Sequence, residues 1–153
     1  QHVLEAVENP HNGLTFCAGS LSSGTHNDVI TLAKKYAYRT HFVHLRSCHI
    51  FPNGNFTEAS HLGGRADLIE LCRIFEAAEQ SGQPNSGHRL PMRVDHGMTF
   101  TDQPNGIMDE SSHGHNAGYT LLGRMFALGQ IQGIIATVDR ELGIPFHQPG
   151  FYD

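Results

Sequence analysis

Three residues whose side chains bind metal ions stand near the ends of three apolar segments. Cys17 ends the segment LTFC, His44 lies within THFVHL, and Asp95 follows PMRV. A thiolate, an imidazole and a carboxylate together favour a transition ion such as Mn²⁺, Fe²⁺ or Zn²⁺, because Mg²⁺ and Ca²⁺ prefer oxygen ligands. Three protein ligands also leave coordination positions open for substrate or water. The residue types therefore predict a catalytic metal site, provided that the fold brings them together.

The alternation of side chains along a strand predicts that they do meet. Neighbouring residues of a strand point to opposite faces, and each segment has one apolar face and one face that ends in a metal-binding side chain. In neighbouring parallel strands these ends lie at one edge, where Cys17, His44 and Asp95 would converge. Each residue has an alternative interpretation: a small buried hydrophobe, a hydrogen-bonded core histidine and a turn-forming aspartate. The metal-ligand interpretation is favoured only because all three side chains are expected on the same face of the sheet.

The segments around these residues alternate between strand and helix patterns, which predicts an α/β protein with a parallel sheet. The expected strands span 14–17, 40–48 and 90–97, and the expected helices span 1–8, 27–36, 66–80 and 119–142. Asn27 is the expected N-cap of its helix, and the stretches 18–25, 49–65 and 98–118 are expected to be loops. The last helix carries a long apolar stripe: Leu121, Met125, Leu128, Ile131, Ile135 and Val138. Three βα units are too few for a closed barrel of about eight strands.

Composition narrows the class of protein. The chain has 153 residues, enough for one domain, and a formal charge of −5, which argues against a nucleic-acid or anionic-membrane partner. No apolar run is expected to span a bilayer, and no signal pattern is visible. The 3 cysteines lack a disulfide framework and favour a cytoplasmic location, with Cys48 and Cys72 as packing residues. At least half of the 12 histidines are expected at the surface. The pair His113 and His115 could bind a metal ion, but a solvated loop is the preferred interpretation.

Two more side chains beside the expected ligands are candidates for other roles. Gly97 ends the third strand, so His96 is expected on the rim of the site and not on the metal. Arg46 points to the same face as His44 and would bind a substrate carboxylate. An internal salt bridge is the alternative for Arg46.

Five blocks of the chain together resemble a known family. They are GLTFCAGSL at 13–21, HFVHLRS at 41–47, FTEASHLGGRADL at 56–68, PMRVDHG at 91–97 and AGYTLLGR at 117–124. In order and spacing they resemble the C-terminal part of the D-mannonate dehydratase family, over about residues 1–140. The resemblance implies a partial (β/α)₈ barrel of the xylose-isomerase type. It also implies Mn²⁺- or Fe²⁺-dependent dehydration of D-mannonate, a small sugar acid, to 2-keto-3-deoxy-D-gluconate in hexuronate breakdown.

The resemblance assigns roles to individual residues. The implied metal ligands are Cys17, His44 and Asp95, the implied catalytic pair is His96 and Tyr119, and Arg46 and His61 are the implied substrate contacts. The ligand set agrees with the facing of the strands. Tyr119 is chosen only through the resemblance, because a tyrosine at a helix start is commonly a packing residue.

The chain also departs from the family pattern. The family has a further metal-binding histidine on a strand before the cysteine strand, whereas His2 and His11 lie in expected helix and turn sequence. We therefore expect residues 1–143 to be the C-terminal portion of a barrel domain and residues 144–153 to be a tail. The isolated chain is expected to have little activity and to expose unpaired strand edges. The full-length protein is expected to form homo-oligomers.

The implied reaction removes the C2 proton and the C3 hydroxyl of a dihydroxy acid. One of His96 and Tyr119 would act as the base and the other as the acid, and the sequence leaves the order open. Two alternatives remain: a related metal-dependent sugar isomerase or epimerase, and a non-catalytic truncated remnant.

Overall fold

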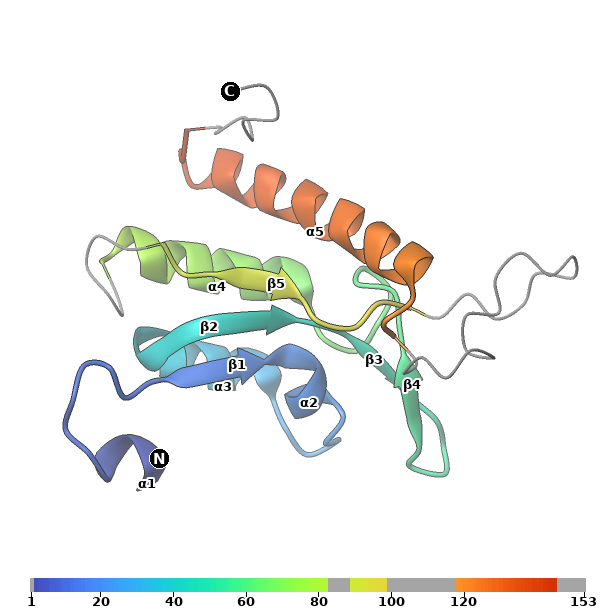
Figure 1. Cartoon of the computed structure of the whole chain (residues 1–153), viewed down its shortest axis with the longest axis horizontal. Helices are drawn as coiled ribbons and strands as arrows, with labels where there is room; N and C mark the ends of the chain where they lie inside the picture. Colours follow the sequence, from blue (N-terminus) through green and yellow to red (C-terminus); the bar gives the residue numbers. More distant parts are fainter. Residues whose placement is uncertain (1, 83–88, 99–117, 146–153) are drawn as a thin grey trace, which may run out of the picture.

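A three-stranded parallel sheet forms the centre of the chain, which is described here by a computed structural model (Figure 1). The structure describes residues 2–82, 89–98 and 118–145. Strands β1 (Leu14–Cys17), β2 (Thr40–Leu45) and β5 (Met92–Val94) lie in the order β1-β2-β5, and both neighbouring pairs are parallel. Helices connect the strands, so the predicted α/β fold with a partial parallel sheet is confirmed.

Each main helix begins at a side chain that caps its first turn. Helices α3 (Val29–Tyr36), α4 (Leu68–Gln80) and α5 (Leu121–Glu141) follow Asp28, Asp67 and Thr120, whose oxygens accept backbone N–H bonds. The expected cap Asn27 is wrong by one residue. Its amide donates instead to the carbonyl of Leu21, at 2.9 Å, while Asp28 takes the capping position.

One face of the sheet is the apolar face that the strand alternation predicts. Phe16, Val43 and Leu45 point to this face and are almost fully buried. The ring of Phe16 packs edge-on against Phe75 of α4, with ring centroids 5.1 Å apart. Figure 1 shows α3 and α4 behind the sheet, with α5 beside β5. The opposite face carries the less buried side chains, among them His44, and therefore remains available for a site.

Two expected loops contain regular structure. The stretch 18–25 holds helix α2 (Ala18–Ser22), and the stretch 49–65 holds most of an antiparallel hairpin of β3 (Cys48–Ile50) and β4 (Phe56–Glu58). The expected strand 40–48 therefore divides, because β2 ends at Leu45 and the chain turns into β3. Gly54 allows the hairpin turn through a φ of +86°. The hairpin lies beyond the C-terminal ends of the sheet strands (Figure 1).

The N-terminal helix is shorter than expected. Helix α1 (His2–Glu5) buries Leu4, whereas Val3 and Val7 are exposed, so the expected three-residue apolar face is wrong. The Asn12 side chain donates to the backbone carbonyls of all three residues and stops the helix early. A short 3₁₀ helix, η1 (Ala37–Arg39), joins α3 to β2.

Helix α5 buries a different stripe from the one expected. Its buried residues are Gly123, Ala127, Ile131, Ile134 and Val138. The expected stripe is right at Ile131 and Val138, but Leu121, Met125 and Leu128 are about half exposed or more. Small residues face inward at the start of the helix because it crosses another segment closely: a Cβ on Gly97 would overlap the backbone of Gly123.

The same helix corrects the expectation that no apolar run could cross a bilayer. An 18-residue window of this 21-residue helix has a mean hydropathy of 1.3, so the helix satisfies that criterion by length and composition. A helix that covers a sheet satisfies the same criterion, and α5 packs on α4 and β5. The expected loop pair His113 and His115, and nearly all of the expected tail, lie outside the described residues.

Candidate metal centre at the strand ends

Cys17, His44 and Asp95 come together at the C-terminal edge of the sheet, as the strand alternation predicts. Their ligand atoms all lie within 4.8 Å of one another. Asp95 Oδ2 is 3.9 Å from Cys17 Sγ and 3.6 Å from His44 Nδ1. The register explains the convergence, because Cys17 pairs with His44 and the pairing of Leu45 with Val94 places Asp95 next along the edge.

The donor set fits a transition-metal ion. Asp95 is 7 % exposed, and its two carboxylate oxygens have different neighbours. Oδ1 accepts from Arg93 Nη2 and from the Tyr119 hydroxyl, both at 3.3 Å, while Oδ2 faces the thiol and the imidazole. Hydrogen bonds to one oxygen of a ligating carboxylate orient the other oxygen toward an ion. The three groups are therefore arranged for a mixed S, N and O shell.

His96 and Tyr119 lie beside this cluster, on segments joined by a short backbone contact. Gly97 N donates to the carbonyl of Gly118 at 2.8 Å, which brings the two chain segments together. The His96 and Tyr119 rings pack edge-on with centroids 4.5 Å apart. His96 Nε2 is 3.6 Å from Asp95 Oδ2. The imidazole therefore lies beside the three grouped ligand atoms, at the rim position that was predicted.

Arg46 forms the internal salt bridge that was considered as its alternative role. Its Nε and Nη2 bind the two carboxylate oxygens of Glu58, at 2.9 and 2.5 Å. Burial by itself would lower the pKa of the guanidinium, but the bonds and charge of Glu58 outweigh burial and raise that pKa above its ordinary value. This two-point pairing fixes both side chains beneath the site.

His61 is not brought to the cluster. Its ring is 1 % exposed, and Nε2 lies 2.7 Å from the carbonyl oxygen of Leu45, a core residue of β2. Burial lowers the pKa of His61 more than this hydrogen bond raises it, which favours the neutral ring. The structure thus places His61 in the core, behind β2.

Glu58 and Arg93 also lie at the site, although the sequence did not predict a role for either of them. Glu58 ends β4 and lies 3.2 Å from His96 Nδ1 as well as bonding Arg46. The only available signal was its position within one of the five blocks, because nothing in the local pattern places the hairpin over the strand ends. Arg93 shares the inward face of β5 with Asp95, and alternation could have identified it.

These observations define an α/β protein with a candidate metal centre at the C-terminal edge of a parallel sheet. The model of the D-mannonate dehydratase (UxuA) family matches residues 1–144. The chain belongs to the D-mannonate dehydratase family, as the five blocks predicted.

Individual relatives agree with the family match. The chain is 38 % identical over 142 residues to mannonate dehydratase 2 of Agrobacterium fabrum, covering 92 % of this chain and 34 % of the relative. It is 37 % identical over 141 residues to a mannonate dehydratase of Saccharophagus degradans, covering 90 % and 34 %. A crystal structure of mannonate dehydratase from Streptococcus suis serotype 2 superposes with a TM-score of 0.69 at 24 % identity, covering 92 % of this chain and 36 % of that one. The chain therefore spans about a third of the length of these relatives.

Proposed function

We propose that this chain is part of a metal-dependent dehydratase that converts D-mannonate to 2-keto-3-deoxy-D-gluconate and water in hexuronate breakdown. The carrying observation is the cluster of Cys17, His44 and Asp95 beside His96 and Tyr119, in a chain of the D-mannonate dehydratase family. The names of the relatives support a small sugar acid as the substrate. We propose a cytoplasmic location because Cys17, Cys48 and Cys72 are free thiols.

The three clustered residues would hold the metal ion. Cys17, His44 and Asp95 provide the ligands, with Mn²⁺ or Fe²⁺ as the proposed ion. When bound, the ion supplies Lewis-acid stabilisation of the negative charge that develops beside the substrate carboxylate. The chain's own task is to orient the ligands, and Arg93 and Tyr119 do this by fixing Asp95 Oδ1.

His96 and Tyr119 would move the two protons of the reaction. The Tyr119 residue is 39 % exposed, so substrate can reach its hydroxyl, whereas the His96 side chain is 21 % exposed and lies deeper. One removes the C2 proton and the other protonates the departing C3 hydroxyl. Their edge-on contact keeps both groups on the same side of the cluster.

Substrate binding is proposed for Arg46 through the side of its guanidinium that does not face Glu58. Arg93 is a second candidate, because its side chain is 40 % exposed and lies beside Asp95. We assign no direct substrate contact to His61, since its ring is bonded to Leu45 in the core.

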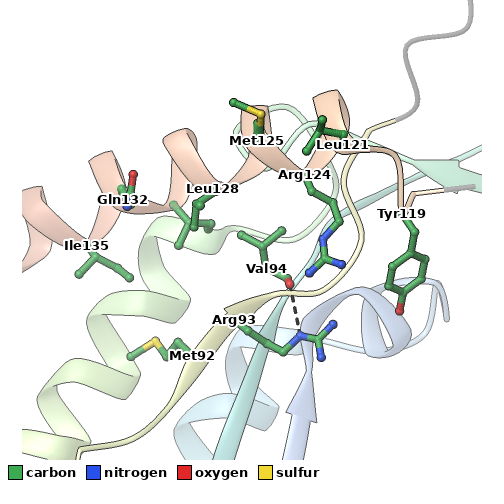
Figure 2. A pocket seen from close by; sticks show the side chains of 11 residues that line it. Met92, Arg93, Val94, Tyr119, Leu121, Arg124, Met125, Leu128, Gln132 and Ile135 are labelled. Carbon is green, nitrogen blue, oxygen red and sulfur yellow. Dashed lines mark hydrogen bonds between the residues drawn. The ribbon is translucent and has the colours of Figure 1, made fainter. Parts of the chain in front are cut away.

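The remaining two thirds of the family's length would complete the barrel. Among the described residues, β1 and β5 each have a sheet neighbour on one side only. A groove of about 950 Å³ lies between β5 and α5. Figure 2 shows apolar residues such as Met92, Leu128 and Ile135 along it. We propose that further barrel elements cover this groove, and that the exposed apolar side chains of α5 face protein, with no role for a membrane or nucleic acid.

A chimeric enzyme tests this function. Residues 1–144 would replace the matching third of the Agrobacterium fabrum relative, and the formation of the 2-keto-3-deoxy product from D-mannonate would be measured. We expect turnover by the chimera and little or none by the 153-residue chain alone. His96→Gln should abolish most turnover at unchanged metal content. Tyr119→Phe should abolish most turnover and also weaken metal binding, because Asp95 Oδ1 loses a hydrogen bond. His49→Gln, at an exposed position on β3, should be silent.

The outcomes separate the alternatives. Isomerisation of aldoses or ketoses by the chimera, without dehydration of mannonate, would support the sugar isomerase alternative. A folded chimera that binds metal and transforms neither substrate class would support a non-catalytic remnant.

A further inference from the structure

Glu58 lies where the β3–β4 hairpin meets the ends of the sheet strands. Its side chain is 8 % exposed and contacts two charged or titratable groups. Both carboxylate oxygens bind Arg46, and Oε1 is also 3.2 Å from Nδ1 of His96. Glu58 therefore connects Arg46, which follows strand β2, with His96, which follows the candidate metal ligand Asp95.

The Nδ1 atom of His96 is enclosed on this side. It has no solvent contact and no aligned hydrogen bond to the described residues, and it faces the Glu58 carboxylate. Gly118 closes the space: its φ is +89°, and a Cβ there would lie 2.8 Å from His96 Nδ1 and 3.0 Å from Glu58 Cγ. A buried ring nitrogen beside a buried carboxylate is satisfied when that nitrogen carries the proton.

The other ring nitrogen has a different environment. Nε2 is 3.6 Å from Asp95 Oδ2, which is beyond hydrogen-bond distance. That same oxygen faces Cys17 and His44 and is the one aimed at the candidate metal position. A proton on Nε2 would prevent this nitrogen from acting as a base, whereas a lone pair there can accept a proton from a substrate held beside the cluster.

We propose that Glu58 is a positioning residue that accepts the Nδ1–H of His96, so that Nε2 keeps its lone pair toward the metal cluster. Arg46 holds the carboxylate in place through its two bonds to Glu58. This arrangement parallels the general rule that the partner of one ring nitrogen sets the role of the other.

The lone pair on His96 Nε2 makes His96 the base and leaves Tyr119 as the acid. This assignment rests on the proposed dehydration. His96 Nε2 takes the C2 proton, and the electron pair of the C2–H bond forms the C2=C3 double bond. The C3–O bond breaks with its electron pair on oxygen, and the leaving hydroxyl takes the Tyr119 phenolic proton and departs as water. The enol at C2 then becomes the ketone, and the imidazolium returns a proton to the phenolate.

Nitrogen-15 NMR of the histidine rings tests the proposal without any turnover. The metal-free chain would be studied over a series of pH values, and the ratio of the two tautomers would be read where the ring signals no longer change with pH. The His96 signals would be assigned by their loss in His96→Gln. We expect the Nδ1–H form to exceed the Nε2–H form by about tenfold or more, as a charge-assisted hydrogen bond favours.

Two glutamate variants provide the comparison. Glu58→Gln should lower the ratio of Nδ1–H to Nε2–H severalfold, while Glu70→Gln removes a carboxylate that binds Arg73 and should leave the ratio unchanged. A wild-type ring in the Nε2–H form, or an unchanged ratio in folded Glu58→Gln, overturns the proposal. If Glu58→Gln does not fold, the wild-type ratio alone decides. Failure of the chimera to dehydrate mannonate while His96 shows the Nδ1–H form would contradict the proposed function and not the role of Glu58.

Discussion

Replacing Glu76 by glutamine should remove a pH-dependent loss of stability. Glu76 is 3 % exposed at the interface of α4 and α5, and its Oε2 has no hydrogen-bond partner among the described residues. Burial, then the nearby charges of Asp139 and Glu79, raise its pKa from 4.5 to about 7, against a smaller opposing effect of Arg89. The folded chain therefore binds a proton that the unfolded chain has already released.

The sign and size follow from this difference. Because folding raises the pKa of Glu76, the contribution of its protonated carboxyl to the free energy of unfolding is fully present below pH 4.5. This contribution is lost as the pH rises toward about 7. At about 1.4 kcal/mol per pH unit, the loss is about 3 kcal/mol above pH 7. Glutamine stays neutral at every pH, so the variant should be more stable than wild type by about this amount at about pH 8 and by little at about pH 4.5.

Urea denaturation followed by circular dichroism at both pH values measures the effect. Glu70→Gln, in the first turn of the same helix, is the control and should not reproduce it. Equal free energies of unfolding for wild type and Glu76→Gln at pH 8 would refute the reasoning, since an ionised carboxylate would then cost nothing at this interface.

Three further changes should alter stability by separate mechanisms. Phe75→Ala should cost about 3–5 kcal/mol in denaturant unfolding because the ring is fully buried, and a loss no larger than that of Phe56→Ala, at an exposed site, would contradict the packing. Gly118→Ala should cost about 1 kcal/mol or more because φ is +89° and the added methyl group meets His96, so an unchanged melting temperature would argue against this turn. Asp67→Ala should cost about 1 kcal/mol through the lost cap of α4, and restored stability in Asp67→Ser would support that cause.

The sheet and the cluster were predictable because both depend on local periodicity. Alternation along β1 and β2 placed Phe16 and Val43 on the helix side and His44 on the other, and the parallel register brought Cys17 level with His44. No long-range information was needed beyond the order of the strands. The family resemblance added Tyr119, which no periodic pattern selects.

The missed features depend on contacts between segments distant in sequence. The hairpin strands have only three residues each, too few to show a period, so nothing local predicts that Glu58 reaches His96. The inward face of α5 was misplaced because the small residues Gly123 and Ala127 are buried where helix and strand ends approach closely, while the larger Met125 is exposed. A close approach between the backbones of two segments leaves no hydrophobic pattern in the sequence, so the sequence alone could not predict it.

The binding of Mn²⁺ or Fe²⁺ to the chain tests the central claim most directly. Calorimetric titration of the metal-free chain, with metal analysis of the bound product, should show one ion per chain for wild type. Cys17→Ser should bind at least about tenfold more weakly, because a thiolate ligand is lost, whereas His49→Gln at an exposed position should bind as wild type does. Wild-type chain that binds no ion, or Cys17→Ser that binds as tightly as wild type, would contradict the assignment of Cys17, His44 and Asp95 as a metal centre.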